Sequence, residues 1–269
     1  MRSNNSKQPQ AQKISVTENI ILSYYRSIDK KNLTLLFIHG LGCAKENYLP
    51  IFDHQFLTAY SMLLPDLIGH GESSKPANFS YSMDDQAKML FKLLEALQIR
   101  GNIFILAHSM GGPIAISLAE LLNDRVLGMV YAEGNIDEGD CSFSKYIAES
   151  FSREEWKKQG FNQTLKSLYD NPELKEYAQT FSKASPIALY ESARDLYRVS
   201  KEESLLTRLV QLSVPVLGIF GEKNKGQYTS EEKLASKFPI HFIPEAGHGM
   251  MVENPQAFYE VINGFLKQI

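Results

Sequence analysis

The sequence has little of what marks secreted, membrane-spanning or nucleic-acid-binding proteins. Its 269 residues include only two cysteines, Cys43 and Cys141, which are too few for a disulfide framework. No apolar run approaches the ~20 residues that a transmembrane helix needs. The net charge of −3 gives no reason to expect nucleic acid or an acidic membrane as a partner. We therefore expect free thiols in a reducing compartment, with the cytoplasm as the default location.

Signals for a bound metal or nucleotide cofactor are also missing. The 6 histidines show no His-x-x-x-His spacing on a predicted helix, and the cysteines form no zinc-type pattern. The Gly-x-Gly at Gly69 and Gly71 is not followed by a predicted helix, which argues against a dinucleotide site. We expect no cofactor and no metal. The expected partner is a small-molecule substrate, and the expected state is a monomer or homodimer.

What is present is the pattern of an α/β protein with an insertion. Residues 1–12 are polar and lack an apolar core, which predicts a disordered tail and not a signal peptide. Strand and helix patterns alternate through residues 13–133 and again through 213–269, which predicts a mostly parallel sheet flanked by helices. Residues 134–212 contain short helical segments with no strand between them, and we expect a helical cap there.

The individual elements follow from hydrophobic periodicity and from helix-capping signals. The expected strands are a hairpin within 13–28, then Leu33–Ile38, Ser61–Pro65, Ile103–Ala107, Val126–Ala132, Val214–Phe220 and Ile240–Ile243. The expected helices of the core are Met83–Leu97, a helix opened by Gly111 and Gly112, Ser230–Lys237, and Pro255–Lys267. In the cap, a capping box at Ser152–Glu155 predicts a helix that ends at Gly160, and Ser185-Pro186 predicts another helix start.

Ser109 is the residue around which the chain is organised. It directly follows an apolar strand and precedes two glycines and a run of small residues, in the order Ala107-His-Ser-Met-Gly-Gly112. A tight turn between a strand and a helix exposes its central residue beside the helix N-terminus. This small-x-Ser-x-Gly pattern in a strand–turn–helix context is typical of a serine nucleophile.

The sequence resembles the α/β-hydrolase fold superfamily over residues ~14–269. The resemblance depends on four motifs: His39-Gly40 after a strand, the loop from Asp66 through Gly69-His70-Gly71 to Ser73, the Ser109 turn, and Gly247-His248-Gly249 near the C-terminus. It implies an α/β-hydrolase fold with an inserted cap. It also implies that Ser109 is the nucleophile, that His248 is its base, and that the backbone N–H groups of Leu41 and Met110 form the oxyanion hole.

The other histidines and Asp66 fit structural roles better than catalytic ones. We expect His39 to brace the oxyanion loop and His108 to point sideways into packing. His54 and His241 have no motif around them. Asp66 and His70 lie in a loop dense in turn-forming residues, where a carboxylate commonly bonds its own backbone.

The triad acid departs from the common pattern of the superfamily. Most members carry an Asp in a Gly-x-x-Asp stretch after the strand predicted at Val214–Phe220, but here the matching residue is Asn224. Glu222 and Glu231 are possible substitutes, and a triad without an acid is a third account. We favour Glu133, because it directly follows the strand after the nucleophile strand, where one subgroup of haloalkane dehalogenases carries a glutamate.

These residues predict a serine hydrolase that cleaves a carboxylic ester of a small or medium, mostly apolar substrate through an acyl-enzyme. A serine cannot perform the alkyl-ester chemistry of dehalogenases, which use an aspartate nucleophile. The alternatives are a carbon–carbon bond hydrolase or thioesterase using the same triad, and a non-catalytic ligand-binding protein on the same scaffold.

Overall fold

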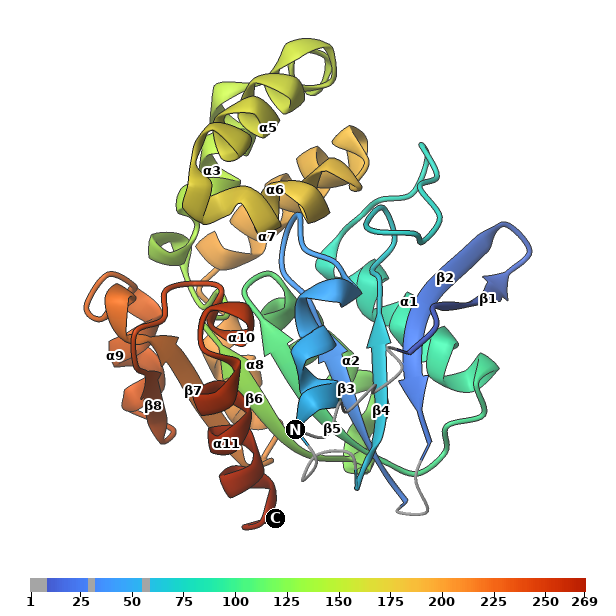
Figure 1. Cartoon of the computed structure of the whole chain (residues 1–269), viewed down its shortest axis with the longest axis vertical. Coiled ribbons are helices and arrows are strands. Elements are labelled where there is room, and N and C mark those ends of the chain that lie inside the picture. The colour runs from blue at the N-terminus through green and yellow to red at the C-terminus, as the bar shows by residue number, and fades with distance from the viewer. Residues whose placement is uncertain (1–8, 29–31, 55–58) are drawn as a thin grey trace, which may run out of the picture.

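A computed structural model of the chain describes residues 9–28, 32–54 and 59–269. Within them, an 8-stranded sheet has the order β1-β2-β4-β3-β5-β6-β7-β8 (Figure 1). The strands are β1 Gln12–Thr17, β2 Ile20–Ser27, β3 Leu33–Ile38, β4 Ser61–Pro65, β5 Asn102–His108, β6 Val126–Ala132, β7 Val216–Gly221 and β8 Ile240–Ile243. The β1–β2 and β2–β4 pairs are antiparallel, and the other neighbours are parallel. The carboxyl ends of β3, β5, β6 and β7 therefore meet at one edge.

Helices cover both faces of this sheet, because the central strands are apolar on both sides. In β3, Leu36 and Ile38 pack into one cluster, and Leu35 and Phe37 pack into the other. The first cluster includes side chains of α1 (Met83–Ala96), α2 (Gly111–Leu122), α8 (Leu205–Gln211) and α9 (Thr229–Ala235). The second includes side chains of the 3-10 helix η1 (Lys45–Asp53), α10 (Met250–Glu253) and α11 (Pro255–Leu266). Short 3-10 turns η2 (Asn123–Arg125) and η6 (Glu222–Asn224) follow α2 and β7.

Between β6 and β7 the chain is helical, and most of this insertion stands beyond the carboxyl edge of the sheet (Figure 1). Its elements are η3 Glu138–Asp140, α3 Ser142–Ser150, α4 Arg153–Glu155, the π-helical η4 Trp156–Gly160, α5 Phe161–Asp170, η5 Pro172–Leu174, α6 Lys175–Ser182, α7 Pro186–Lys201 and then α8. Helix α8 instead packs on α2, where Arg208 and Glu120 form an ion pair at 2.7 Å. The cap predicted over 134–212 thus includes one helix that lies with the core.

Most predicted elements are present, several with ends shifted by one or two residues, and two regions need separate comment. Of the tail predicted at residues 1–12, residues 1–8 lie outside the described residues, and Gln12 already begins β1. The predicted helix end at Gly160 is wrong, because α4, η4 and α5 continue through it. A Cβ on Gly160 would lie 2.8 Å from Cε3 of Trp156 and 2.9 Å from Cδ1 of Phe151. Gly160 therefore permits close aromatic packing inside a helix instead of ending it.

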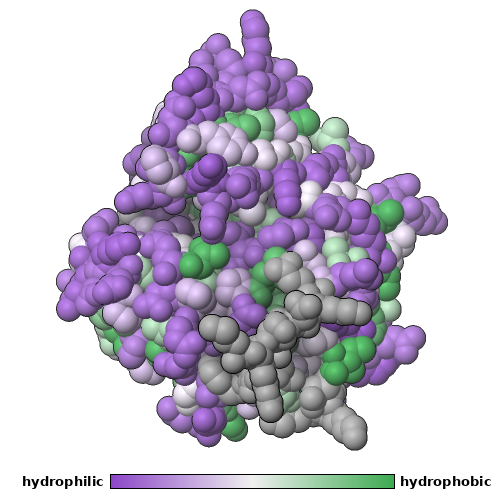
Figure 2. Space-filling view, viewed as in Figure 1, coloured by the Kyte–Doolittle hydropathy of each residue, from purple (hydrophilic) through white to green (hydrophobic). Residues whose placement is uncertain are grey.

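The visible surface is largely hydrophilic. Figure 2 shows hydrophobic residues scattered in small groups over the coloured part of this face, including the outer side of the cap. Among the described residues, no helix is long and apolar enough to cross a membrane.

Candidate active site

The turn between β5 and α2 holds Ser109 in a strained backbone conformation. Its φ is +53°, in the left-handed region that residues with a side chain rarely adopt. The turn is tight because α2 begins against the end of β3: a Cβ on Gly111 would lie 2.4 Å from the carbonyl oxygen of Ile38. The Ser109 amide donates to the carbonyl of Ala132 at 3.0 Å, which ties the turn to β6. The expected strand–turn–helix context of Ser109 is present, and Ser109 lines a cavity.

Two backbone amides beside Ser109 are available as hydrogen-bond donors. The N–H groups of Leu41 and Met110 have no hydrogen-bond partner among the described residues. The carbonyl of Gly40 accepts hydrogen bonds from the Cys43 amide at 3.2 Å and from Nδ1 of His39 at 2.9 Å. In a trans peptide the C=O and N–H point in opposite directions. Holding the Gly40 carbonyl in this way therefore also fixes the direction of the Leu41 N–H.

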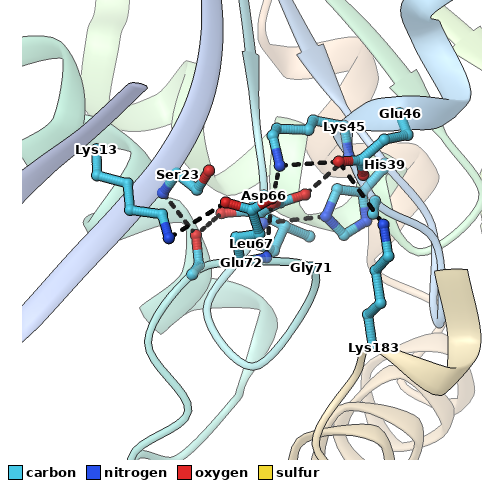
Figure 3. A network of polar contacts seen from close by, with 12 residues as sticks. Lys13, Ser23, His39, Lys45, Glu46, Asp66, Leu67, Gly71, Glu72 and Lys183 are labelled. Carbon is cyan, nitrogen blue, oxygen red and sulfur yellow. Dashed lines mark hydrogen bonds and ion pairs between the residues drawn. The ribbon is translucent and has the colours of Figure 1, made fainter. Parts of the chain in front are cut away.

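His39 braces the loop after β3 that contains Leu41, as expected from the sequence. Because its Nδ1 donates to a carbonyl, its Nε2 is the acceptor for the Leu67 amide at 3.0 Å. Burial lowers the pKa of His39 to about 4, so the ring stays neutral near neutral pH. Figure 3 shows His39 next to the contacts of Asp66, whose carboxylate accepts from the ammonium of Lys45 at 2.7 Å and from the Glu72 amide at 2.9 Å. Asp66 therefore ties its own loop to η1 and does not reach the cavity.

The loop between β8 and α10 presents His248. The carboxylate of Glu253 accepts from the Gly247 amide at 2.8 Å and the Gly249 amide at 3.0 Å, on both sides of the histidine. The Nε2 of His108 donates to the carbonyl oxygen of His248 at 2.8 Å. His108 was expected only to pack, and it additionally anchors this loop. The backbone of His248 is thus held on three sides.

Glu133, at the end of β6, meets the ring of His248. Its φ is +40°, another strained value, and its side chain is fully buried. One carboxylate oxygen lies 2.5 Å from Nδ1 of His248, and the other accepts from the Gly221 amide at 2.7 Å. Because a carboxylate only accepts, Nδ1 of His248 carries the proton. Nε2 is therefore the basic nitrogen that remains for chemistry.

Ser109, His248 and Glu133 line one cavity of about 650 Å³ between the sheet edge and the cap. Leu41 also lines it, whereas the Met110 side chain is buried. No hydrogen bond joins Ser109 to His248 within the described part of the chain. In enzymes without substrate such bonds are often long and tighten when substrate binds.

A family comparison bears on the fold. Residues 34–176 match the family described as alpha/beta hydrolase fold. The chain belongs to this family. The predicted fold is confirmed by this match and by the similarity to solved structures described next.

Known proteins similar to this α/β hydrolase include several hydrolases. Lipase 3 of Moraxella sp. (strain TA144) is 41% identical over 85 residues, which are 32% of this chain and only 26% of the lipase. The 2-hydroxy-6-oxo-6-(2'-aminophenyl)hexa-2,4-dienoic acid hydrolase of Metapseudomonas resinovorans is 24% identical over 261 residues, 88% of this chain and 85% of that enzyme. A thermophilic esterase from Thermogutta terrifontis has a TM-score of 0.76 at 23% identity, covering 96% of this chain and 98% of that chain. At this identity, the last likeness shows the fold alone.

Asn224 has a role in this α/β hydrolase that the sequence did not reveal. Its amide nitrogen donates to both carboxylate oxygens of Glu133 at 3.0 Å. The two rival acids contact backbone amides elsewhere: Glu222 accepts from the Glu245 amide in the loop after β8 at 3.1 Å, and Glu231 accepts from the Gly226 amide at 2.7 Å. Of the candidate acids, Glu133 is the one that the structure brings to His248.

Tyr228 is a second residue of this site that sequence reasoning missed. Its hydroxyl lies 3.5 Å from Nδ1 of His248, and burial together with nearby Glu133 raises its pKa. No motif surrounds it, so no sequence signal could have found it. The remaining three histidines lie elsewhere: His70 is buried beside the ring of His39, His54 packs against the ring of Tyr259, and His241 is exposed on β8. Among the described residues, no group of side chains could hold a metal ion.

Proposed function

We propose that this protein is a serine hydrolase that cleaves carboxylic esters through an acyl-enzyme. The observation that carries the proposal is the bond between Glu133 and Nδ1 of His248, in the same cavity as the strained Ser109. A serine hydroxyl is a weak nucleophile until a base and oxyanion donors accompany it. Here the base is oriented by a buried carboxylate, and two unpaired amides lie beside the serine.

The arrangement supports the following course of reaction. Ser109 Oγ attacks the ester carbonyl while Nε2 of His248 takes its proton. The Leu41 and Met110 amides stabilise the oxyanion, and Glu133 stabilises the imidazolium. His248 then gives its proton to the departing alkoxide, which leaves as the alcohol. Water attacks the acyl-enzyme by the same steps, and the acid is released as Ser109 regains its proton.

The cavity lining supports a neutral, mostly apolar substrate. A volume of about 650 Å³ suits a small or medium ligand. Apolar side chains from the cap and from α10 line it, among them Phe143, Leu168, Leu174, Leu196 and Met251. Its acidic lining residues are Glu133, Asp140, Glu173, Glu176 and Glu253, and no lysine or arginine of the described residues lines it. Such a lining repels anions and gives a carboxylate or phosphate no counter-ion.

The similar proteins include a lipase, an esterase and a hydrolase of a dienoic acid. The lipase supports ester cleavage. The third keeps carbon–carbon bond hydrolysis as an alternative, but a substrate acid would meet an acidic cavity here. Both cysteines are free and buried, which supports the cytoplasm as the proposed location.

The test is turnover of p-nitrophenyl butyrate by the wild type and by Ser109→Ala. We expect the wild type to hydrolyse the ester. The hydrolysis rate of Ser109→Ala should fall to the uncatalysed background, because the attacking oxygen is gone. A folded wild type that hydrolyses neither this ester nor its thioester analogue would favour a ligand-binding protein instead.

The charge of the acyl group tests the substrate class. We expect the monoester of succinate with p-nitrophenol, which carries a carboxylate, to show a kcat/KM at least tenfold below that of the butyrate ester. The double variant Glu173→Gln, Glu176→Gln should reduce the difference in kcat/KM between the two esters, because it removes two of the cavity's carboxylates. Equal rates for the two esters in the wild type would contradict the neutral-substrate proposal.

A further inference from the structure

The cap reaches the oxyanion loop through one hydrogen bond. Tyr177 lies on α6, and its hydroxyl donates to the carbonyl oxygen of Leu41 at 2.8 Å. Leu41 is the core residue whose amide is a proposed oxyanion donor. A residue of the inserted helices and a residue next to the nucleophile are therefore in direct contact across 136 positions of sequence.

The bond matters because of the two peptide planes that meet at Leu41. The Gly40–Leu41 plane is held by the core, through His39 and the Cys43 amide. The Leu41–Gly42 plane is held by the cap, through Tyr177. A residue has two soft dihedrals, and fixing the planes on both sides of it fixes both. The core thus holds the peptide that carries the Leu41 N–H, and the cap holds the next peptide, so that Leu41 is restrained from both sides.

The surroundings of Gly42 show how closely α6 packs against the loop that contains Leu41 and Gly42. The φ of Gly42 is +72°, and a Cβ there would lie 2.5 Å from Cδ2 of Phe181 and 2.7 Å from the Tyr177 hydroxyl oxygen. Phe181 is fully buried and stacks on Phe161 of α5, with ring centroids 5.4 Å apart. The loop therefore fits against α6 only because residue 42 has no side chain.

We propose that Tyr177 is a positioning residue that sets the oxyanion hole from the cap. When α6 is docked, the hydroxyl holds the Leu41–Gly42 peptide and the Leu41 amide is aimed at the developing oxyanion. When α6 is displaced, the contacts of the core alone restrain Leu41, and its amide is held less tightly. The docking of the cap over the cavity and the stabilisation of the oxyanion are coupled in this way. The proposal depends on the serine chemistry proposed above.

The phenol is suited to this task over a wide pH range. Burial raises the pKa of Tyr177 well above its ordinary value, so the hydroxyl keeps its proton and remains a donor. Its bond is made to the backbone, so the role needs no contact between Tyr177 and the substrate.

The experiment compares Tyr177→Phe with Tyr190→Phe. Tyr190 is a matched control, because it is also a buried cap tyrosine whose hydroxyl donates to a backbone carbonyl, that of Phe151 at 3.0 Å, and it does not line the cavity. Loss of a whole oxyanion donor typically costs about 10²–10³ in kcat. For a loosened donor we expect a smaller loss: kcat about tenfold lower in Tyr177→Phe, KM within about twofold, and a trifluoromethyl ketone inhibitor bound about tenfold more weakly. Tyr190→Phe should leave all three values near those of the wild type.

Two further readouts separate this inference from the proposed function. Hydrogen exchange of residues 36–44 should be faster in Tyr177→Phe than in Tyr190→Phe, whether or not the protein is an esterase. Labelling of the wild type by a fluorophosphonate tests the serine chemistry itself. An unlabelled wild type would overturn the proposed function and this proposal with it. Suppose instead that the wild type is labelled, but Tyr177→Phe keeps the kcat and the hydrogen-exchange rates of the wild type. This result would overturn the role of Tyr177 alone, and so would a higher KM at unchanged kcat in Tyr177→Phe.

Discussion

At the scale of single residues, the acid and its neighbours form a matched set. Glu133 lies next to His248, and Asn224 lies at the position where the resemblance to the superfamily predicts an aspartate. The Asn224 amide and the Gly221 amide both donate to the Glu133 carboxylate. An uncharged donor at position 224 is what a carboxylate at position 133 requires, because a second carboxylate there would repel it. The absence of an acid at 224 and the presence of one at 133 are therefore a single feature.

Asn224→Asp tests this complementarity. It would place a second carboxylate within about 3 Å of Glu133, and two carboxylates that close do not both stay ionised near neutral pH. We expect kcat/KM to fall more than tenfold, whereas Asn224→Ala, which only removes a donor, should lose less than tenfold. The double variant Glu133→Gln, Asn224→Asp restores one acid and one amide, so it should be more active than Glu133→Gln alone. Wild-type activity in Asn224→Asp would show that the amide is not needed.

Buried histidines with lowered pKa values, among them His39, His70 and His108, make stability depend on pH. Burial lowers the pKa of His39 to about 4 and, with His39 nearby, that of His70 to about 3, from an ordinary 6.5. Between 6.5 and these values the unfolded chain binds more protons than the folded one, so acidification favours unfolding. We expect the free energy of unfolding in urea to fall as pH drops from about 7 to about 4.

His70→Gln removes one of these groups and serves as the check. The slope of unfolding free energy against pH should decrease by up to ~1.4 kcal/mol per pH unit, the value for one proton. The same slope in this variant and in the wild type would exclude His70 as a source of the pH dependence.

At the scale of elements, apolar runs and capping residues made most of the structure predictable. The strands Leu33–Ile38, Ser61–Pro65, Val126–Ala132 and Ile240–Ile243 have the predicted bounds, because each is a short apolar run closed by turn residues. Ser82 and Ser185 cap α1 and α7 as their sequences indicate. The helix end predicted at Gly160 was wrong because glycine is needed there for tertiary packing: Trp156 and Phe151 fill the space that a side chain would occupy.

Gly160→Ala tests whether the cost of crowding Trp156 and Phe151 exceeds the gain from the higher helix propensity of alanine. Alanine favours a helix interior by about 1 kcal/mol over glycine. The added methyl would lie 2.8 Å from Trp156, and overpacking costs about 1–3 kcal/mol. We expect a lower Tm. The control is Gly264→Ala in α11, where no atom lies within 4 Å of the added Cβ and the Tm should rise. A higher Tm in both variants would mean that the cap relaxes around residue 160 without cost.

At the scale of the whole molecule, the sheet edge brings distant parts of the chain to one place. The strand order puts β6 between β5 and β7, so the ends that carry Ser109 and Glu133 are neighbours. That adjacency could be predicted from the alternation of strands and helices. Together with the resemblance to a subgroup of haloalkane dehalogenases, it is why Glu133 could be named in advance. The contacts of Glu253, His108 and Tyr177 could not be, because they depend on loop paths and side-chain reach and not on any local pattern.

The central claim is that Glu133 is the acid of a Ser109–His248 pair, and the most direct measurement of it is kcat for Glu133→Gln. The amide keeps the shape but loses the charge that stabilises the imidazolium and fixes its tautomer; in serine proteases the equivalent change costs about 10⁴. We expect kcat to fall about 10³- to 10⁴-fold in a folded protein, while Glu222→Gln and Glu231→Gln stay within about tenfold of the wild type. A folded Glu133→Gln variant with kcat within about tenfold of the wild type would contradict the account.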